Sequence, residues 1–181
     1  GALLARGLRN HGHDCRILAR RNSQFAQRMT HEGFEVRTFS RRGRSPRNAW
    51  RIRRCLRRWR PDVLHLNDPH AVTSAGLASI GLPIPLRVAA RRVDFPLKWA
   101  IRYRSLTDIM VCVSQAVRQI CAEAGLPPES LFVVPDGVDP TRMHGGDRQR
   151  GRATLGVNAK TPLLLTVARL TDHKGHRYMM E

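Results

Sequence analysis

The sequence predicts an α/β protein built on a parallel β-sheet, and three features lead to this class. Short apolar runs alternate along the chain with longer amphipathic segments, as strands and helices do in β-α-β units. The strand-like runs are apolar on successive residues, which predicts strands that are covered on both faces. Glycine and proline residues separate the segments. Right-handed crossovers between such strands produce a parallel sheet.

The first half of the chain supplies helices and strands in alternation. Its first helix has Leu3, Leu4 and Leu8 on one face and arginines on the other, and it ends at Gly12. A later helix begins at Ser45 and carries an apolar stripe. This stripe comprises Ala49, Ile52, Cys55, Leu56 and Trp59, and the other elements expected in this half are strands at 15–19, 35–39 and 62–66 and helices at 23–32 and 71–80.

The second half continues the alternation and contains a candidate linker. Ser114 is a natural N-cap for a helix that runs through Ala124 and stops at Gly125. The polar stretch 137–150 reads as turns, and a new strand-and-helix unit begins after it. We therefore divide the chain into a domain at 1–139 and the beginning of a second domain at 140–181. The expected elements are strands at 86–90, 109–113, 131–134 and 163–167 and helices at 96–103, 114–124, 152–155 and from Gly175.

Composition excludes several classes of protein. The 181 residues are 41% hydrophobic and 25% charged, which is typical of globular domains and not of disordered chains. No apolar run approaches the roughly 20 residues of a membrane-spanning helix, and the start has no apolar signal core, so we expect neither a span nor a secretory signal. The four cysteines form no C-x-x-C pair and no zinc-site spacing. They predict free thiols in a reducing cytosol and no metal site.

The charge is strongly positive and unevenly placed. Lys and Arg number 32 against 14 acids, a net charge of +18, and the only lysines are Lys98, Lys160 and Lys174. Two interpretations stay open: an arginine-favouring composition, or a partner rich in phosphate such as nucleic acid, a nucleotide or an anionic membrane. The excess is concentrated at 41–60, which has no acid and ten arginines: Arg41, Arg42, Arg44, Arg47, Arg51, Arg53, Arg54, Arg57, Arg58 and Arg60.

Polar residues follow the predicted strands. Ligands of open α/β sheets bind beyond the carboxyl ends of the strands, so we regard these residues as candidates. Arg169 and Lys174 bracket a strand-to-helix loop, where a guanidinium fork and an ammonium would suit a diphosphate. Ordinary alternatives remain open: solvated cations, a core histidine, a plain turn and a surface ion pair. The other candidates are His65, Asn67, Asp68 and His70 after strand 62–66, Arg92 and Asp94 after 86–90, and Asp136 and Gly137 after 131–134.

Four runs in one order resemble family 4 retaining glycosyltransferases of the GT-B fold. The run VARLTDHKGHRYMME at 167–181 is similar to that family's G-R-L-x-x-x-K-G segment, and RPDVLHLNDPHA at 60–71 to its P-D-V-V-H-x-H segment. LARGLRNHGHDCRILAR at 4–20 looks like its first helix and second strand. The stretch 102–139, which ends in VVPDGVD, looks like the segment that leads to the crossing between the two domains.

The resemblance implies two Rossmann-like domains that face each other across a cleft. The first domain would hold the acceptor and the second a nucleotide-sugar, a co-substrate, with no other cofactor. Arg169 and Lys174 match the pair that neutralises the donor diphosphate, which implies that no metal is needed. Asp136 and Gly137 match the crossing beside the nucleotide. The remaining roles are catalytic for His65, Asn67 and Asp68, which would face the transferred sugar, and acceptor-binding for His70, Arg92 and Asp94.

Departures from the family pattern limit these assignments. Asn67 stands where the family has the second histidine of H-x-H, and Ala168 replaces the glycine before Arg169. The family's first strand and glycine-rich loop should precede residue 1, and its E-x7-E segment should follow residue 181. We therefore expect a fragment that does not turn over alone. The run AARRVDFP also resembles members that act on lipopolysaccharide-type or capsule-type glycans.

Three hypotheses follow for the function. The first is a cytoplasmic transferase that acts on a glycan or lipid-linked acceptor, with the 41–60 segment docked on the inner face of the cell membrane. The second is a basic nucleic-acid-binding protein, in which Trp50 and Trp59 would stack on bases. We expect both tryptophans on the apolar side of their helix, which makes nucleic acid the less favoured partner. The third is a nucleotide-sugar epimerase or dehydrogenase, for which the chain lacks a G-x-G-x-x-G loop.

Overall fold

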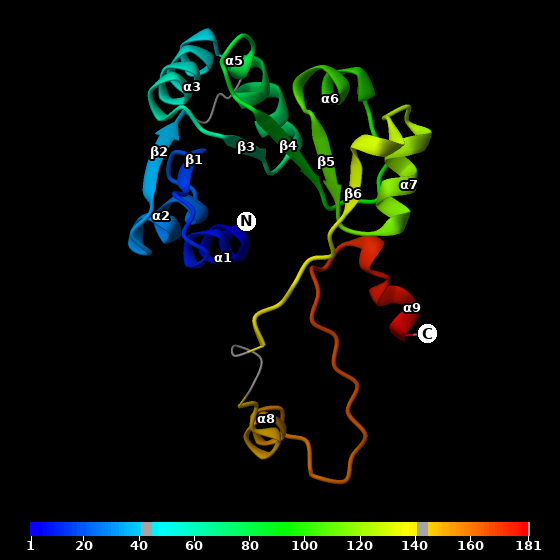
Figure 1. Cartoon of the computed structure of the whole chain (residues 1–181). Helices are drawn as coiled ribbons and strands as arrows, with labels where there is room; N and C mark the ends of the chain where they lie inside the picture. The colour runs from blue at the N-terminus through cyan, green and yellow to red at the C-terminus, as the bar shows by residue number, and fades with distance from the viewer. Residues whose placement is uncertain (41–44, 141–144, 181) are drawn as a thin grey trace. The chain divides into compact units, whose positions relative to one another are not determined.

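The computed structural model describes residues 1–40, 45–140 and 145–180 and confirms the α/β class (Figure 1). The chain divides into two compact units, Gly1–Gly137 and Val138–Glu181. Most of the regular structure belongs to the first unit, which also contains the buried core. None of the helices in the described ranges has the length and apolar character needed to cross a membrane.

The first unit begins with two helices and two strands. Helices α1 (Ala2–Asn10) and α2 (Gln24–His31) alternate with β1 (Arg16–Arg20) and β2 (Glu35–Phe39). The two strands pair in parallel, as expected for a β-α-β unit. The Ser23 hydroxyl accepts a hydrogen bond from the Ala26 amide and so begins α2.

The face of α1 that carries Ala5 and Arg6, rather than its leucine face, packs against the rest of the first unit, and Ala5 belongs to a buried cluster with Met29 and Phe34. Arg6 donates two hydrogen bonds of 2.8 Å to the Glu32 carboxylate, and Arg9 lies over the ring of Phe34. Among the described residues the three leucines of α1 remain 39% to 45% exposed: Leu3, Leu4 and Leu8. The leucine pattern therefore located the helix but not its buried side, which packs through Ala5 and carries the Arg6–Glu32 ion pair.

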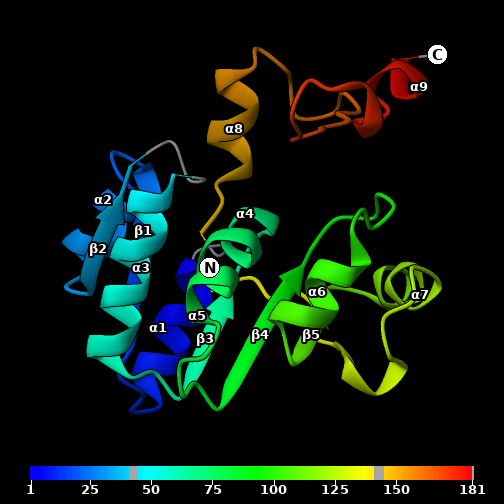
Figure 2. The same ribbon diagram turned by 90° about the horizontal axis from the view of Figure 1, so that it is seen from above.

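The second half of the first unit forms a four-stranded parallel sheet. Its order is β3-β4-β5-β6, with β3 (Val63–Leu66), β4 (Leu86–Arg91), β5 (Ile109–Cys112) and β6 (Leu131–Val133). Figure 2 shows the arrowheads of β2, β3 and β4 directed to the same side. The described strands thus make two parallel sheets where the sequence led us to expect one, because the apolar pattern predicts strands but not which neighbours share hydrogen bonds.

Burial alternates along two strands of the four-stranded sheet, the edge strand β3 and the inner strand β5. In β3 the residues Leu64 and Leu66 are buried and Val63 and His65 are exposed, and β5 has the same period. The expectation that both faces of each strand would be covered is therefore wrong for β3, whereas the alternate residues of β5 are partly covered. Their covered face packs on helices, while the other face of β3 presents a polar side chain near the strand end.

Serine and aspartate caps begin most of the helices of this unit. Helix α3 (Pro46–Trp59) is capped by the Ser45 hydroxyl and α7 (Gln115–Glu123) by the Ser114 hydroxyl, as predicted. The expected helix at 71–80 is one continuous helical segment, which consists of α4 (Pro69–Ala71), the π-helix η1 (Val72–Gly76) and α5 (Leu77–Ser79). A Cβ on Gly76 would lie 3.1 Å from the Leu106 Cβ, so glycine permits the close packing of η1 on α6.

Helix α6 (Ala100–Leu106) begins four residues later than the predicted helix at 96–103. Trp99 has a left-handed backbone with a φ of 63°, which interrupts helical geometry directly before Ala100. A short 3-10 helix, η2 (Pro128–Ser130), leads from α7 into β6.

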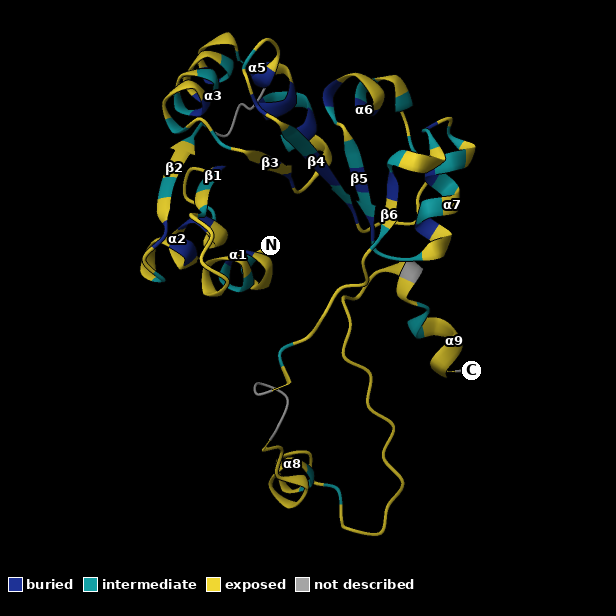
Figure 3. Ribbon diagram, viewed as in Figure 1, coloured by how far each residue is buried: buried dark blue, intermediate teal, exposed yellow. Residues whose placement is uncertain are grey.

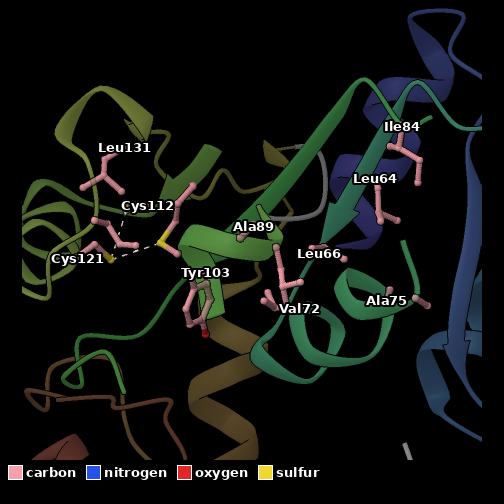
Figure 4. Close-up of a cluster of buried hydrophobic side chains, with 14 of the residues drawn as sticks. Leu64, Leu66, Val72, Ala75, Ile84, Ala89, Tyr103, Cys112, Cys121 and Leu131 are labelled. Carbon is pink, nitrogen blue, oxygen red and sulfur yellow. Dashed lines mark hydrogen bonds between the residues drawn. The ribbon is translucent and has the colours of Figure 1, made fainter. Parts of the chain in front are cut away.

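The core of the first unit lies between the four-stranded sheet and its helices (Figures 3 and 4). Leu66 and Val72 pack there with Tyr103 and Ala89, and all four are less than 9% exposed. The Cys112 and Cys121 sulfurs are 4.0 Å apart within the same core and are free thiols. The packed core holds the four strands, and with them the residues that follow the strand ends, in fixed positions relative to one another.

One of the two tryptophans on α3, Trp50, departs from the expectation that both lie on the apolar side of the helix. Trp59 is half-buried, and its indole Nε1 donates to the Glu35 carboxylate at 3.3 Å. Trp50 is 59% exposed and does not belong to the core. The apolar stripe of α3 instead buries Ile52 and Leu56 together with Asn48, and at 100° per residue Trp50 falls on the opposite side. Arg41, Arg42 and Arg44 lie outside the described residues.

The second unit contains short helices and extended chain. These are α8 (Arg148–Thr154), the 3-10 helix η4 (Asp172–Lys174) and α9 (His176–Met180). The predicted strand at 163–167 is wrong, because this segment pairs with no strand among the described residues. Its apolar side chains are exposed, with Leu164 at 87% and Val167 at 90%. A strand needs hydrogen-bonded neighbours, which an apolar run cannot itself provide.

Candidate functional site

Arg92 joins the ends of three strands at the carboxyl edge of the sheet. It follows β4, and its Nη1 donates to the Asn67 Oδ1 at 2.9 Å, just after β3. Its Nε donates to the Asp136 Oδ1 at 3.1 Å, after β6. Parallel strands place these residues at one edge, and the long arginine side chain spans the distance between them. The sequence located all three residues but did not predict that they form one network.

His65 lies on β3 beside this network. Its side chain keeps contact with solvent, yet the surrounding protein atoms displace water from the ring and lower the pKa of the His65 imidazole. The positive charge of Arg92 acts in the same direction. The imidazole is therefore neutral near pH 7, so it can exchange hydrogen bonds with a sugar hydroxyl or accept its proton.

Asp68 has a structural role in the first unit. Its Oδ1 accepts hydrogen bonds from the amides of His70 and Ala71, at 2.8 and 2.9 Å, and so begins α4. The His70 side chain is exposed on that first turn. Sugar contacts by these two residues stay a prediction, since the cap explains the position of the Asp68 carboxylate without a ligand.

Asp94 stands apart from the network. It lies two residues beyond Arg92 on the segment before α6 and is exposed. Within the described chain it takes no part in the bridge that Arg92 makes to Asn67 and Asp136. The expected acceptor pair of Arg92 and Asp94 is thus not brought together here.

Arg91 is a site-edge residue that the sequence analysis did not select. Its side chain is only 7% exposed at the end of β4, and an Nη2 proton is donated to the Phe95 carbonyl. Its Nε has no partner among the described atoms. Successive residues of an extended chain point to opposite sides. The buried Arg91 side chain therefore binds the loop that follows β4, while the Arg92 side chain points to the other side and reaches Asn67 and Asp136. In the sequence, the pair Arg91-Arg92 directly after apolar strand residues is the feature that could have identified Arg91 as a candidate.

Arg169 and Lys174 lie in the second unit, and both are exposed. The Arg169 carbonyl is 2.7 Å from a ring nitrogen of His176, and the Lys174 amide donates to the Thr171 carbonyl. Gly175, with a φ of 68°, makes the left-handed turn into α9. Arg169 and Lys174 thus lie at a tight loop that no strand precedes among the described residues, and their role at a diphosphate stays a prediction.

The first unit has the architecture of α/β enzymes that bind ligands beyond the strand ends. Comparison with known families agrees with this class. The family model for Glycosyltransferase Family 4 matches residues 2–142. The chain therefore belongs to Glycosyltransferase Family 4, which confirms the family that the four sequence runs resembled.

Individual relatives share 30% sequence identity or less with the parts of this chain that they match. A D-inositol 3-phosphate glycosyltransferase from Nocardia farcinica (strain IFM 10152) is 30% identical over 118 residues, which are 65% of this chain and 25% of that protein. The crystal structure of a glycosyltransferase from Rickettsia africae ESF-5 has a TM-score of 0.79 at 19% identity. That match covers 96% of this chain and 49% of the Rickettsia chain. The chain thus spans about a quarter of the first relative and about half of the second.

A second solved structure shows the same fold. Anabaena Alr3699/HepE, crystallised with UDP and glucose, matches with a TM-score of 0.60 at 14% identity. The match covers 77% of this chain and 42% of that one. Together the structural matches confirm the predicted α/β fold.

Proposed function

We propose that this chain belongs to a glycosyltransferase that transfers a sugar from a nucleotide-sugar to a glycan or lipid-linked acceptor with retention of configuration. The observation that carries the proposal is the bridge from Arg92 to Asn67 and Asp136, formed at the strand edge of a Glycosyltransferase Family 4 chain. That edge is where α/β enzymes bind their ligands.

The donor side of the proposal rests on the second unit and on a structural neighbour. The HepE crystals contain UDP, UDP with glucose, or UDP-glucose. In our proposal Arg169 and Lys174 bind the donor diphosphate, where negative charge develops as the sugar leaves. Two cations would stabilise that charge in the way a divalent metal does elsewhere, so transfer would be independent of added metal. Asp136 and Gly137 would lie beside the nucleotide.

The acceptor side of the proposal rests on the first unit. The name of the Nocardia relative indicates a phosphorylated polyol acceptor for that enzyme. Arg92 offers a guanidinium of the kind that binds phosphate, and its two present partners are an amide and one carboxylate. Neutral His65 would hold the acceptor hydroxyl. Glycans of lipopolysaccharide or capsule type are the acceptors that we propose to test first.

We also place the reaction on the cytoplasmic side of the cell membrane. All four cysteines are free, and the two buried sulfurs lie 4.0 Å apart without a bond. Unbridged thiols are the form that cysteine takes in a reducing compartment.

Calorimetry on the full-length protein tests the donor assignment. UDP-, GDP- and ADP-sugars would be titrated into the wild type and into an Arg169→Ala/Lys174→Ala variant, with Lys160→Ala as a matched exposed-cation control. We expect one nucleotide-sugar to bind, with at least 100-fold weaker binding in the double variant, because each charge-assisted contact contributes about 1.5–3 kcal/mol. The anomeric configuration of the product, measured by NMR, tests retention, and activity in a chelator tests metal independence.

Failure of the proposal has a defined form. If no nucleotide-sugar binds the folded protein, the transferase function is refuted. If a donor binds equally well to the wild type and the double variant, the enzyme class survives and the diphosphate role of Arg169 and Lys174 does not.

A further inference from the structure

The outer face of α3 is a continuous basic surface with one aromatic side chain in it. The opposite face is buried through Asn48, Ile52 and Leu56. At 100° per residue, the residues on the other side share one stripe along the 14-residue helix. We call this stripe the outer α3 face, and it consists of Arg47, Trp50, Arg51, Arg54, Arg57 and Arg58, all of which are exposed.

The charges of the outer α3 face have no acidic partner among the residues that the structure describes. Helix α3 contains no acidic residue, and none of the five arginines forms an ion pair in the ranges 1–40, 45–140 and 145–180. Other arginines of this unit serve the fold. Arg53 donates to the Ala78 and Ile80 carbonyls, and Arg87 to carbonyls and a serine. In the described part of the chain, the outer arginines therefore have neither a counter-charge nor a hydrogen bond that holds the fold.

Trp50 indicates what kind of polyanion this face meets. Its side chain is 59% exposed, and the Arg54 guanidinium lies 5.5 Å from its ring centroid. Trp50 is thus the one aromatic side chain among the arginines of the outer α3 face. An exposed indole among arginines suits the headgroup region of a bilayer, which is both anionic and partly apolar.

We propose that the outer α3 face docks on a membrane surface that contains anionic phospholipid, with Trp50 inserted at the headgroup level. Nucleic acid is the less fitting polyanion, because single strands are bound by a series of stacked aromatic rings, and this face has one. Each basic residue near an anionic bilayer strengthens binding about fivefold. Five arginines together with one indole provide the two signals, electrostatic and apolar, that stable peripheral binding requires.

The start of α3 is fixed near the strand edge. The buried Asn48 exchanges hydrogen bonds with Ser40, which directly follows β2. Helix α3 thus begins at the end of the unit to which β2 points, and its first turns carry Arg47, Trp50 and Arg51. If the proposed function holds, docking through this face brings the acceptor site near lipid headgroups, and a lipid-linked acceptor becomes the favoured class.

Vesicle binding tests the surface without any substrate, so its result is independent of sugar transfer. The probes are sedimenting vesicles of phosphatidylcholine alone and of equimolar phosphatidylcholine and phosphatidylglycerol. The test variant is Arg47→Gln/Arg51→Gln/Arg54→Gln, because positive charge in the first half of a helix opposes its dipole and its removal should not unfold α3. The charge-matched control is Arg104→Gln/Arg148→Gln/Arg150→Gln, whose arginines are exposed on α6 and α8.

We expect the wild type to bind only the anionic vesicles, and the α3 variant to bind them about 100-fold more weakly, while the control loses less than about fivefold. In a Trp59→Phe/Trp99→Phe variant, Trp50 is the single remaining tryptophan, and its emission should shift to shorter wavelength on the vesicles. Equal losses in the two triple variants, or an unshifted Trp50 emission, would overturn the proposal. So would tighter binding to duplex DNA than to vesicles at the same salt and phosphate concentration.

Discussion

Replacing Arg92 with alanine should separate the function of the strand edge from its stability. The ion pair to Asp136 is an exposed one, with 61% of the carboxylate side chain and 33% of the arginine side chain open to solvent. Such pairs contribute about 0.2–1 kcal/mol, and the hydrogen bond to Asn67 adds about 1 kcal/mol. We therefore expect Arg92→Ala to lower the free energy of unfolding by about 1–2 kcal/mol, a Tm shift of about 2–8 °C.

The same change should cost far more in catalysis if Arg92 binds the acceptor. A charge-assisted contact contributes about 1.5–3 kcal/mol, so kcat/KM for the acceptor should fall about 10- to 100-fold. The assay is initial-rate product formation by the full-length protein, with a thermal melt of each variant. Arg104→Ala, which removes an exposed arginine of α6, is the matched control. An unchanged kcat/KM, or a loss of stability above about 4 kcal/mol, would refute this view of Arg92.

Further predictions concern thiols, acid stability and the core. Burial raises the pKa of the Cys121 thiol to about 12 and also raises the pKa of the Cys112 thiol. Both thiols should therefore resist iodoacetamide at pH 8 in the folded protein, while the half-buried Cys55 reacts. Mass spectrometry of the protein labelled in its native state measures this difference. Hydrogen bonds from Arg6 and Arg28 lower the pKa of Glu32 to about 2. The stabilisation that the Glu32 carboxylate provides is therefore complete above its ordinary pKa and is lost as the pH falls toward 2. When the free energy of unfolding is plotted against pH, Glu32→Gln should reduce the slope within this window and leave the slope at higher pH unchanged. Leu66→Ala should destabilise by about 2–5 kcal/mol in urea unfolding, and a value below 1 kcal/mol would contradict its place in the core.

Elements with local signals were predictable from the sequence. The strand at 35–39 and the helices that begin after Ser45 and Ser114 have the expected bounds, or nearly so. A capping hydroxyl satisfies amides within its own first turn, and a short apolar run between turn residues favours a strand. Information of this kind lies within about ten residues of chain, so it can be read without knowing the fold.

Features that depend on distant partners were not predictable. The run 163–167 has strand-like composition but pairs with no strand in the described chain, and Trp50 is exposed although its helix was correctly located. The late start of α6 follows from the left-handed backbone at Trp99, a conformation that tryptophan rarely adopts and that no sequence rule predicts. In each case the deciding neighbour or backbone angle is set by tertiary structure.

The arginines show why the site itself was only half predictable. Strand ends identified Asn67, Arg92 and Asp136, because polar residues after parallel strands must lie at one edge. Side-chain alternation then gives Arg91 and Arg92 opposite roles, since one is buried against a carbonyl and the other bridges the strand ends. The helical period makes the same distinction on α3, where Arg53 caps a neighbouring helix and Arg54 faces solvent beside Trp50. A net charge of +18 therefore contains arginines that hold the fold and arginines that remain exposed, and their position relative to the strand pleat or the helix face separates the two kinds.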